Sequence, residues 1–171
     1  MFHTSPPPFA RDGFVTLEVG DLATARTAAA AAALGGFTAV LLSPVGAASF
    51  MGVKWWRAII SALTSDGAVN ESARNDISER HDFIDILDCD RFAGHAATAL
   101  AAGQERIVLH PSCPQIRSIE VLAESLGRHV LRDRPNAIVV TPSMTAEDVL
   151  TLLPRSDVAA GPHGQRAVRT A

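Results

Sequence analysis

The chain alternates between short apolar runs and longer Ala-rich or amphipathic stretches, which is the pattern of β-strands connected by helices. The first run, at residues 14–19, alternates apolar and polar positions with a period of two, so it predicts a strand with one less-buried face. Later runs are continuously apolar, as expected for strands buried on both sides in a parallel sheet. The predicted strands cover residues 14–19, 37–42, 83–88, 106–110 and 129–132, and a further short strand is suggested at 138–141.

Residues suited to helix ends stand at the borders of the stretches between these strands. Asp21 is a good N-cap, and Thr145 with Asp148 three residues later resembles a capping box. Gly103 stands where a helix C-cap needs a positive φ. The predicted helices cover residues 22–34, 53–63, 92–102, 115–126 and 145–153.

This order of elements predicts an α/β fold with a mainly parallel sheet of about five strands flanked by helices. From the right-handed crossover rule we expect helices on both faces of the sheet. The domain should span residues 13–153, after an irregular Pro-rich arm at 1–12 and before a flexible tail at 154–171. The polar stretch at 64–82 predicts a long loop or a short exposed helix near 71–80.

Two segments of the chain can be aligned with each other. Gly36–Pro44 matches Gly103–Pro111, and each segment follows an Ala-rich helix that itself follows a strand beginning with Phe. The match favours two tandem βαβα units, with halves at 13–64 and 83–134. The alternative is that buried βα units in any Ala-rich protein resemble one another.

Composition excludes several classes of protein. With 171 residues, 47% of them hydrophobic and 19% charged, the chain is large enough for one globular domain with its own core. The net charge is −3 and the ordered part has no basic block, so we expect no nucleic-acid partner. The apolar runs are too short for a membrane partner, and no signal peptide is evident at the start. Two cysteines suit a reducing compartment, so the expected location is cytoplasmic.

Candidate site residues follow from topology, because ligands of an open parallel sheet bind beyond the carboxyl ends of its strands. Residues that follow each predicted strand should therefore lie along one edge. They are Glu18, Gly20 and Asp21 after the first strand, Ser43 after the second, Asp88, Cys89 and Asp90 after the third, His110, Ser112 and Cys113 after the fourth, and Arg132, Asp133 and Arg134 after the last.

The long connection at residues 43–52 is the first candidate site, because small residues before a helix N-terminus let backbone N–H groups approach an anion. The spacing does not match a phosphate-binding loop motif. The alternative is that the small residues only pack against a neighbouring strand. The candidate ligand-binding residues are Ser43, Gly46, Ser49, Gly52 and Lys54.

A carboxylate, a thiol and an imidazole form the second candidate site. Asp88, Cys89 and His110 follow adjacent strands, and this grouping can activate a nucleophile, so they are the candidate catalytic residues. The alternative is that Cys89 is a small buried apolar residue and that His110 bonds a backbone carbonyl.

A zinc site is a further interpretation of the same edge. His110 and Cys113 are close enough in the sequence to be two ligands of one zinc ion, Cys89 could supply a third and His95 could join them, but paired Cys-x-x-Cys motifs are absent. We therefore assign no metal ligand and no cofactor. Asp85, inside a predicted strand, is either on an exposed face or a buried acid.

The run AATALAAGQERIVLHPSCPQI, within residues 96–131, resembles the βα units of (βα)8-barrel aldolases of the keto-deoxy-phosphogluconate type. The resemblance covers about a fifth of the chain. It implies Schiff-base chemistry from a strand lysine, but no predicted strand contains lysine and the chain is too short for eight βα units. Only the local βα geometry is therefore carried over.

The sequence favours binding of a small molecule, phosphorylated or otherwise anionic, at the carboxyl edge, and leaves open whether the protein is an enzyme. The alternative is a non-catalytic interaction or regulatory module that could form a homo-oligomer. Phe50, Trp55 and Trp56 lie close together in the sequence and would then form an exposed apolar patch.

Overall fold

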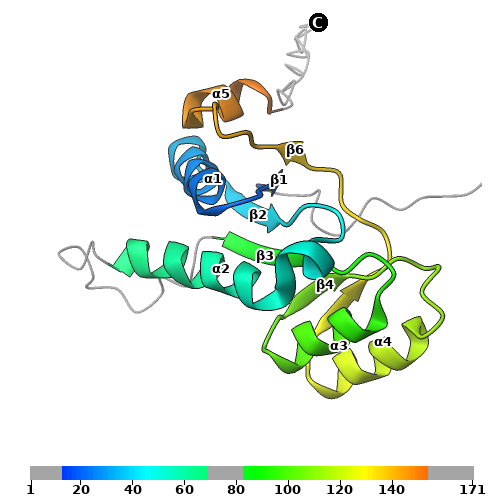
Figure 1. The fold of residues 1–171 in the computed structure, drawn as a ribbon. Helices are drawn as coiled ribbons and strands as arrows, with labels where there is room; N and C mark the ends of the chain where they lie inside the picture. Colours follow the sequence, from blue (N-terminus) through cyan, green and yellow to red (C-terminus); the bar gives the residue numbers. More distant parts are fainter. Residues whose placement is uncertain (1–12, 69–82, 154–171) are drawn as a thin grey trace, which may run out of the picture.

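The computed structural model describes residues 13–68 and 83–153, which form a six-stranded parallel sheet with helices packed against it (Figure 1). The α/β class is therefore confirmed, with one strand more than expected. The predicted arm, exposed helix and tail lie outside the described residues. The strands are β1 Phe14–Glu18, β2 Thr38–Leu42, β3 Phe83–Asp88, β4 Arg106–Val108, β5 His129–Leu131 and β6 Ile138–Val139. The helices are α1 Leu22–Gly35, α2 Val53–Ala68, α3 Ala93–Ala101, α4 Ile116–Ser125 and α5 Ala146–Thr151, with a π-helical turn, η1, at Ala48–Gly52.

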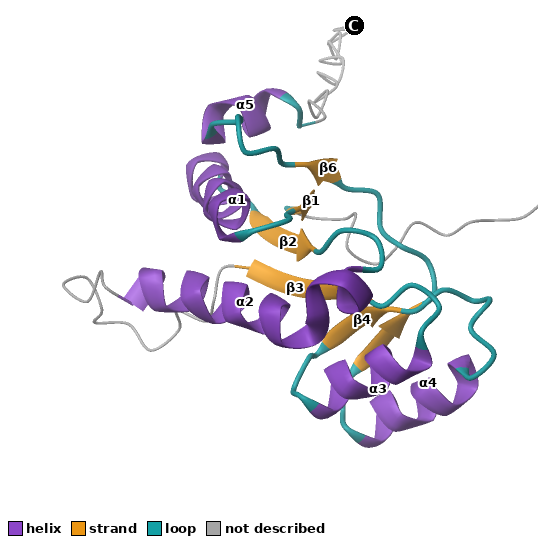
Figure 2. Ribbon diagram, viewed as in Figure 1, coloured by secondary structure: helices purple, strands orange, loops and turns teal. Residues whose placement is uncertain are grey.

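The strands stand in the order β5-β4-β3-β2-β1-β6. From β1 to β5 each new strand is added beside the previous one and in the same direction. Right-handed crossovers then place every connecting helix on the same face of the sheet. The helices accordingly form one layer, in which α5 contacts α1, α1 contacts α2, α2 contacts α3 and α3 contacts α4 (Figure 2). The expectation of helices on both faces is wrong, because the strand order from β1 to β5 never reverses direction across the sheet.

The two faces of the sheet therefore differ in what covers them. On the helix-covered face, Leu41, Leu87 and Ile107 are fully buried in a cluster that includes residues of all five helices. On the second face, four residues form a separate buried cluster to which no described helix contributes. These four are Val40, Leu42, Ile86 and Val108. Apolar residues thus occupy both sides of the central strands, as their continuous apolar sequences predict.

The predicted helix starts are confirmed. The Asp21 carboxylate accepts a hydrogen bond from the Thr24 N–H at 2.8 Å, and the Asp21 N–H donates to Thr24 Oγ1 at 3.1 Å, which completes a capping box. The bond from the Thr24 N–H holds the pKa of Asp21 below its ordinary value. Thr145 and Asp148 form the same arrangement at α5. Gly103 has a φ of +99°, as its place after α3 requires.

The connection from β5 to β6 crosses the whole sheet, because these strands lie at opposite edges. We call residues 132–137 the strap. Five strand spacings amount to about 24 Å, and the seven residue steps from Leu131 to Ile138 reach at most about 25 Å. The strap must therefore run nearly extended, and Figure 1 shows it passing from the lower edge to the upper edge without a helix. No crossover helix is needed, because β6 pairs only with Leu17 and Glu18, at the carboxyl end of β1.

No helix in the described ranges combines the length and the apolar character needed to cross a bilayer.

Candidate functional site

Asp88, the last residue of β3, organises the carboxyl edge of the sheet. The residue is only 2% exposed, and its Oδ1 atom accepts hydrogen bonds from the N–H groups of Gly46 at 2.9 Å and Asp90 at 2.8 Å. Its own N–H donates to Ser43 Oγ at 2.8 Å. One residue therefore fixes the loops that follow β2 and β3. Asp90 is held there at a φ of +50°, in the left-handed region that Asp tolerates better than most residues.

Arg134, near the middle of the strap, completes this network. Its guanidinium donates to Asp88 Oδ2, to Glu18 Oε2 at 2.6 Å and to the carbonyl oxygen of Ser43 at 2.7 Å. We call these four residues the Arg134 clamp. The clamp joins the carboxyl ends of β1, β2 and β3 through a single cation. Because Asp88 is buried and Glu18 is partly buried, Arg134 also offsets part of their negative charge, one positive charge against two negative ones.

The candidate catalytic residues are not assembled as a nucleophile site. Asp88 and Cys89 are consecutive, so their side chains point to opposite faces of the sheet. Asp88 bonds Arg134, whereas Cys89 is fully buried in the helix-covered core. His110 is exposed, and its Nδ1 atom lies 2.7 Å from Ser112 Oγ. Within the described ranges, no hydrogen bond joins Asp88, Cys89 and His110 side chains to one another.

Burial also makes the Cys89 thiol a poor nucleophile. Loss of solvation, and to a smaller extent the charge of Asp88, raises the pKa of Cys89 from 9.0 to about 12. At neutral pH the thiol is therefore protonated, and it behaves as the small apolar residue that the alternative interpretation describes.

The zinc interpretation finds no support in the geometry. Cys113 is a buried free thiol, as is Cys89. His95 lies on α3 against Phe92, with the ring centroids 5.9 Å apart. In the part of the chain that the structure describes, no three His, Cys, Asp or Glu side chains are placed to hold a metal ion.

The connection after β2 is shorter than the sequence suggests, because the chain is already helical from Ala48 onward. Gly46 points its N–H at Asp88, so this donor is occupied by the protein's own carboxylate. Ser49 and Lys54 are exposed on η1 and α2. Gly52 has a φ of +89° where the π-helical turn passes into α2, a conformation that favours glycine. Of the predicted ligand-binding residues, Ser43 thus belongs to the Arg134 clamp and Gly46 bonds to it, whereas Ser49 and Lys54 lie on the exposed surface.

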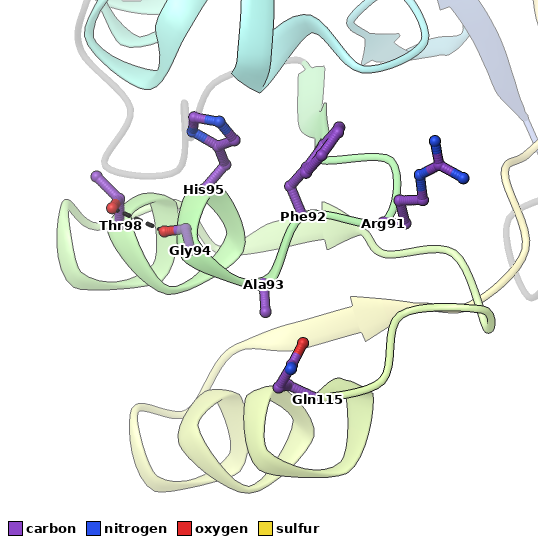
Figure 3. A pocket seen from close by; sticks show the side chains of 7 residues that line it. All are labelled: Arg91, Phe92, Ala93, Gly94, His95, Thr98 and Gln115. Carbon is purple, nitrogen blue, oxygen red and sulfur yellow. Dashed lines mark hydrogen bonds between the residues drawn. The ribbon is translucent and has the colours of Figure 1, made fainter.

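A pocket of about 570 Å³ opens at the same edge, at the start of α3 (Figure 3). We call it the α3 pocket. Arg91, Phe92 and His95 reach its surface from the start of α3, and Gln115 enters from the start of α4. Neither helix has a side chain that caps its N-terminus. The remaining lining residues are Ala93, Gly94 and Thr98.

Sequence reasoning placed Arg134 at this edge but could not assign its partners, and it did not single out Arg91, Phe92 or Gln115. Of the residues that line the α3 pocket, it named only His95, as a zinc ligand. The available signal was weak: a basic residue immediately before a helix that lacks an Asp, Asn, Ser or Thr at its N-cap.

Comparison of the chain with protein-family models, with curated proteins and with solved structures finds no match.

Replacing Arg134 with Gln should lower the free energy of unfolding by about 3 kcal/mol. This is the lower end of the range for breaking a buried ion pair, because Arg134 and Glu18 keep about a fifth of their side-chain surface exposed. Arg132→Gln is the matched control. Arg132 pairs with Glu120 on the surface, where solvent screens the charges, so its loss should cost much less than the loss of Arg134. Urea unfolding measures the free energy of unfolding of both variants. If both lose the same amount of it, the clamp does not stabilise the sheet.

Cys89 should resist iodoacetamide in the native protein at pH 8 and react once the chain is unfolded, as followed by mass spectrometry. Since folding raises this pKa from 9.0 to about 12, the thiol stabilises the fold fully below pH 9. This contribution to the free energy of unfolding is lost as pH rises from 9 towards 12. In Cys89→Ala the free energy of unfolding should no longer fall with pH for this reason. Rapid native labelling of Cys89 would contradict the assignment.

Proposed function

We propose that this protein binds a small anionic molecule in the α3 pocket, at the carboxyl edge of the sheet. The observation that carries the proposal is the composition of this pocket: Arg91 and His95 line it, and the described lining residues include no acid. Its volume of about 570 Å³ lies within the range of small-molecule sites. A phosphate, sulfate or carboxylate group on a small organic molecule fits this chemistry.

The orientation of α3 supports the same ligand class. The N-terminus of a helix carries partial positive charge and free N–H groups, and here no side chain of the protein caps it. Arg91 adds a full positive charge immediately before the first turn. The ring of Phe92, 43% exposed, provides an apolar surface for the uncharged part of the ligand.

We assign binding and no reaction. Asp88 is occupied by the Arg134 clamp, and the Cys89 thiol is buried on the other face of the sheet. The clamp acts in this proposal as the rigid base of the site, because it fixes Asp90, the residue before Arg91.

Arg91→Gln should weaken binding of anionic compounds about tenfold, the loss expected for one charge-assisted hydrogen bond. A thermal-shift screen with inorganic phosphate, sugar phosphates and carboxylic acids would identify the compound, and calorimetric titration would give the affinity. Lys54→Gln removes the same charge from exposed α2 and should leave the affinity unchanged. Loss of binding in Lys54→Gln but not in Arg91→Gln would move the anion to the start of α2 and refute the proposal.

Exposed aromatic side chains at the same edge favour a second candidate function, a non-catalytic module that self-associates. Phe50 is 66% exposed on η1, which contacts α3, and Trp55 is 36% exposed on α2. Trp56 does not belong to this surface, because it is fully buried. Of the expected patch of three aromatic residues, only Phe50 and Trp55 are therefore exposed, and Phe92 at the N-cap of α3 is a further exposed aromatic residue.

If this surface mediates self-association, sedimentation velocity should show a concentration-dependent dimer that Phe50→Ser weakens. Leu34→Ser is the control. Leu34 is about as exposed as Phe50, at 63%, but it lies at the C-terminal end of α1, away from the carboxyl edge of the sheet. A monomer at every protein concentration would exclude this second function and leave the binding proposal untouched.

A further inference from the structure

A second pocket lies at the opposite end of the sheet, where β3 and β4 begin. Its volume is about 350 Å³, and it is lined by α2, by the first residues of β3 and by the turn between α3 and β4. We call it the amino-end pocket. It shares no lining residue with the α3 pocket.

Asp85 contributes an uncompensated negative charge to this pocket. It lies in β3 on the helix-covered face, half-buried, and its Oδ2 atom accepts hydrogen bonds from Trp56 Nε1 at 3.1 Å and Gln104 Nε2 at 2.6 Å. Both donors are neutral groups. Among the described residues, no arginine, lysine or histidine lies within ion-pair distance of Asp85. A carboxylate withdrawn from water normally gains a cationic partner, so the missing partner points to a ligand.

Arg57 contributes a positive charge on a different wall of the same pocket. Its guanidinium lies over Gly103, where an added Cβ would come within 3.3 Å of Nη1. It forms no ion pair with any residue of the described ranges. Arg106 differs, because it is neutralised by Glu105 at 2.9 Å. Within the described residues, the amino-end pocket therefore holds one negative charge and one positive charge that form no ion pair with each other or with another side chain.

We propose that the amino-end pocket binds a small zwitterion, an α-amino acid, with its ammonium group at Asp85 and its carboxylate at Arg57. Separated opposite charges on the two walls match the two charged groups of such a ligand, and a volume of about 350 Å³ suits its size. The neighbouring Ile60, Ser61 and Thr64 of α2 would face its side chain.

The structure contains a built-in reporter for this site. Trp56 is fully buried and donates its indole N–H directly to Asp85, so an ammonium group bound there should change its fluorescence. The chain has two tryptophans, and Trp55→Phe leaves Trp56 as the only one. The experiment titrates the full-length Trp55→Phe protein with each standard α-amino acid, and separately with propylamine and with propionate.

We expect a saturable fluorescence change with one or more amino acids and a much weaker one with propylamine or propionate. In the same background, Asp85→Asn and Arg57→Gln should each raise the Kd about tenfold or more. Asn keeps the oxygen that accepts from Trp56 and Gln104, so the melting temperature should stay close to that of the parent. Arg132→Gln, which removes a positive charge outside this pocket, is the control and should bind normally.

Several results would overturn the proposal. They are no response to any amino acid, an equal response to propylamine, or full affinity in the Arg57→Gln variant. Arg57 is on the exposed side of α2, so its variant tests the site even where a change at Asp85 impairs folding. Calorimetry of anion binding to the α3 pocket is independent of these outcomes, because Arg91 lies at the other end of the sheet.

Discussion

The reach of the strap is the constraint on which the rest of the carboxyl edge depends. It joins the two outermost strands with six residues and has almost no slack, so its middle must pass over the central strands. Arg134 is in that middle, and the residues below it are Asp88, Ser43 and Glu18. One extended segment therefore sets the position of the cation, and the cation sets the loops from which the α3 pocket is built.

Alternation along the strands separates the roles of neighbouring acids. Asp85 faces the helices and the amino-end pocket, whereas Asp88, three residues later, faces the opposite side and the strap. The two ends of the sheet also differ in electrostatics. At the carboxyl end Glu18 and Asp88 are paired with Arg134, and the α3 pocket beside them is lined by Arg91 and His95. At the amino end an acid and a base remain apart in one cavity.

Local signals in the sequence were sufficient for most elements of the fold. Hydrophobic periodicity located the strands and helices, and the caps at Asp21 and Thr145 were recognisable because their partners lie three residues away. Strand order has no local signal, so the single helical layer could not be predicted. The clamp was equally hidden, since Arg134 is 46 residues from Asp88 and 116 from Glu18. The separation of Asp88 from Cys89 was predictable, because consecutive side chains of a strand point to opposite faces.

The strand order and the clamp also determine which parts of the sheet can form while the chain is being synthesised. Strands β1 to β4 and their helices leave the ribosome before the strap does, and each can pair with its predecessor at once. Glu18 and Asp88 then share one edge without their counter-ion. Until the strap is made, the nascent sheet consequently carries two acids at this edge without a cation. Arg134 supplies that cation when the strap passes over the edge.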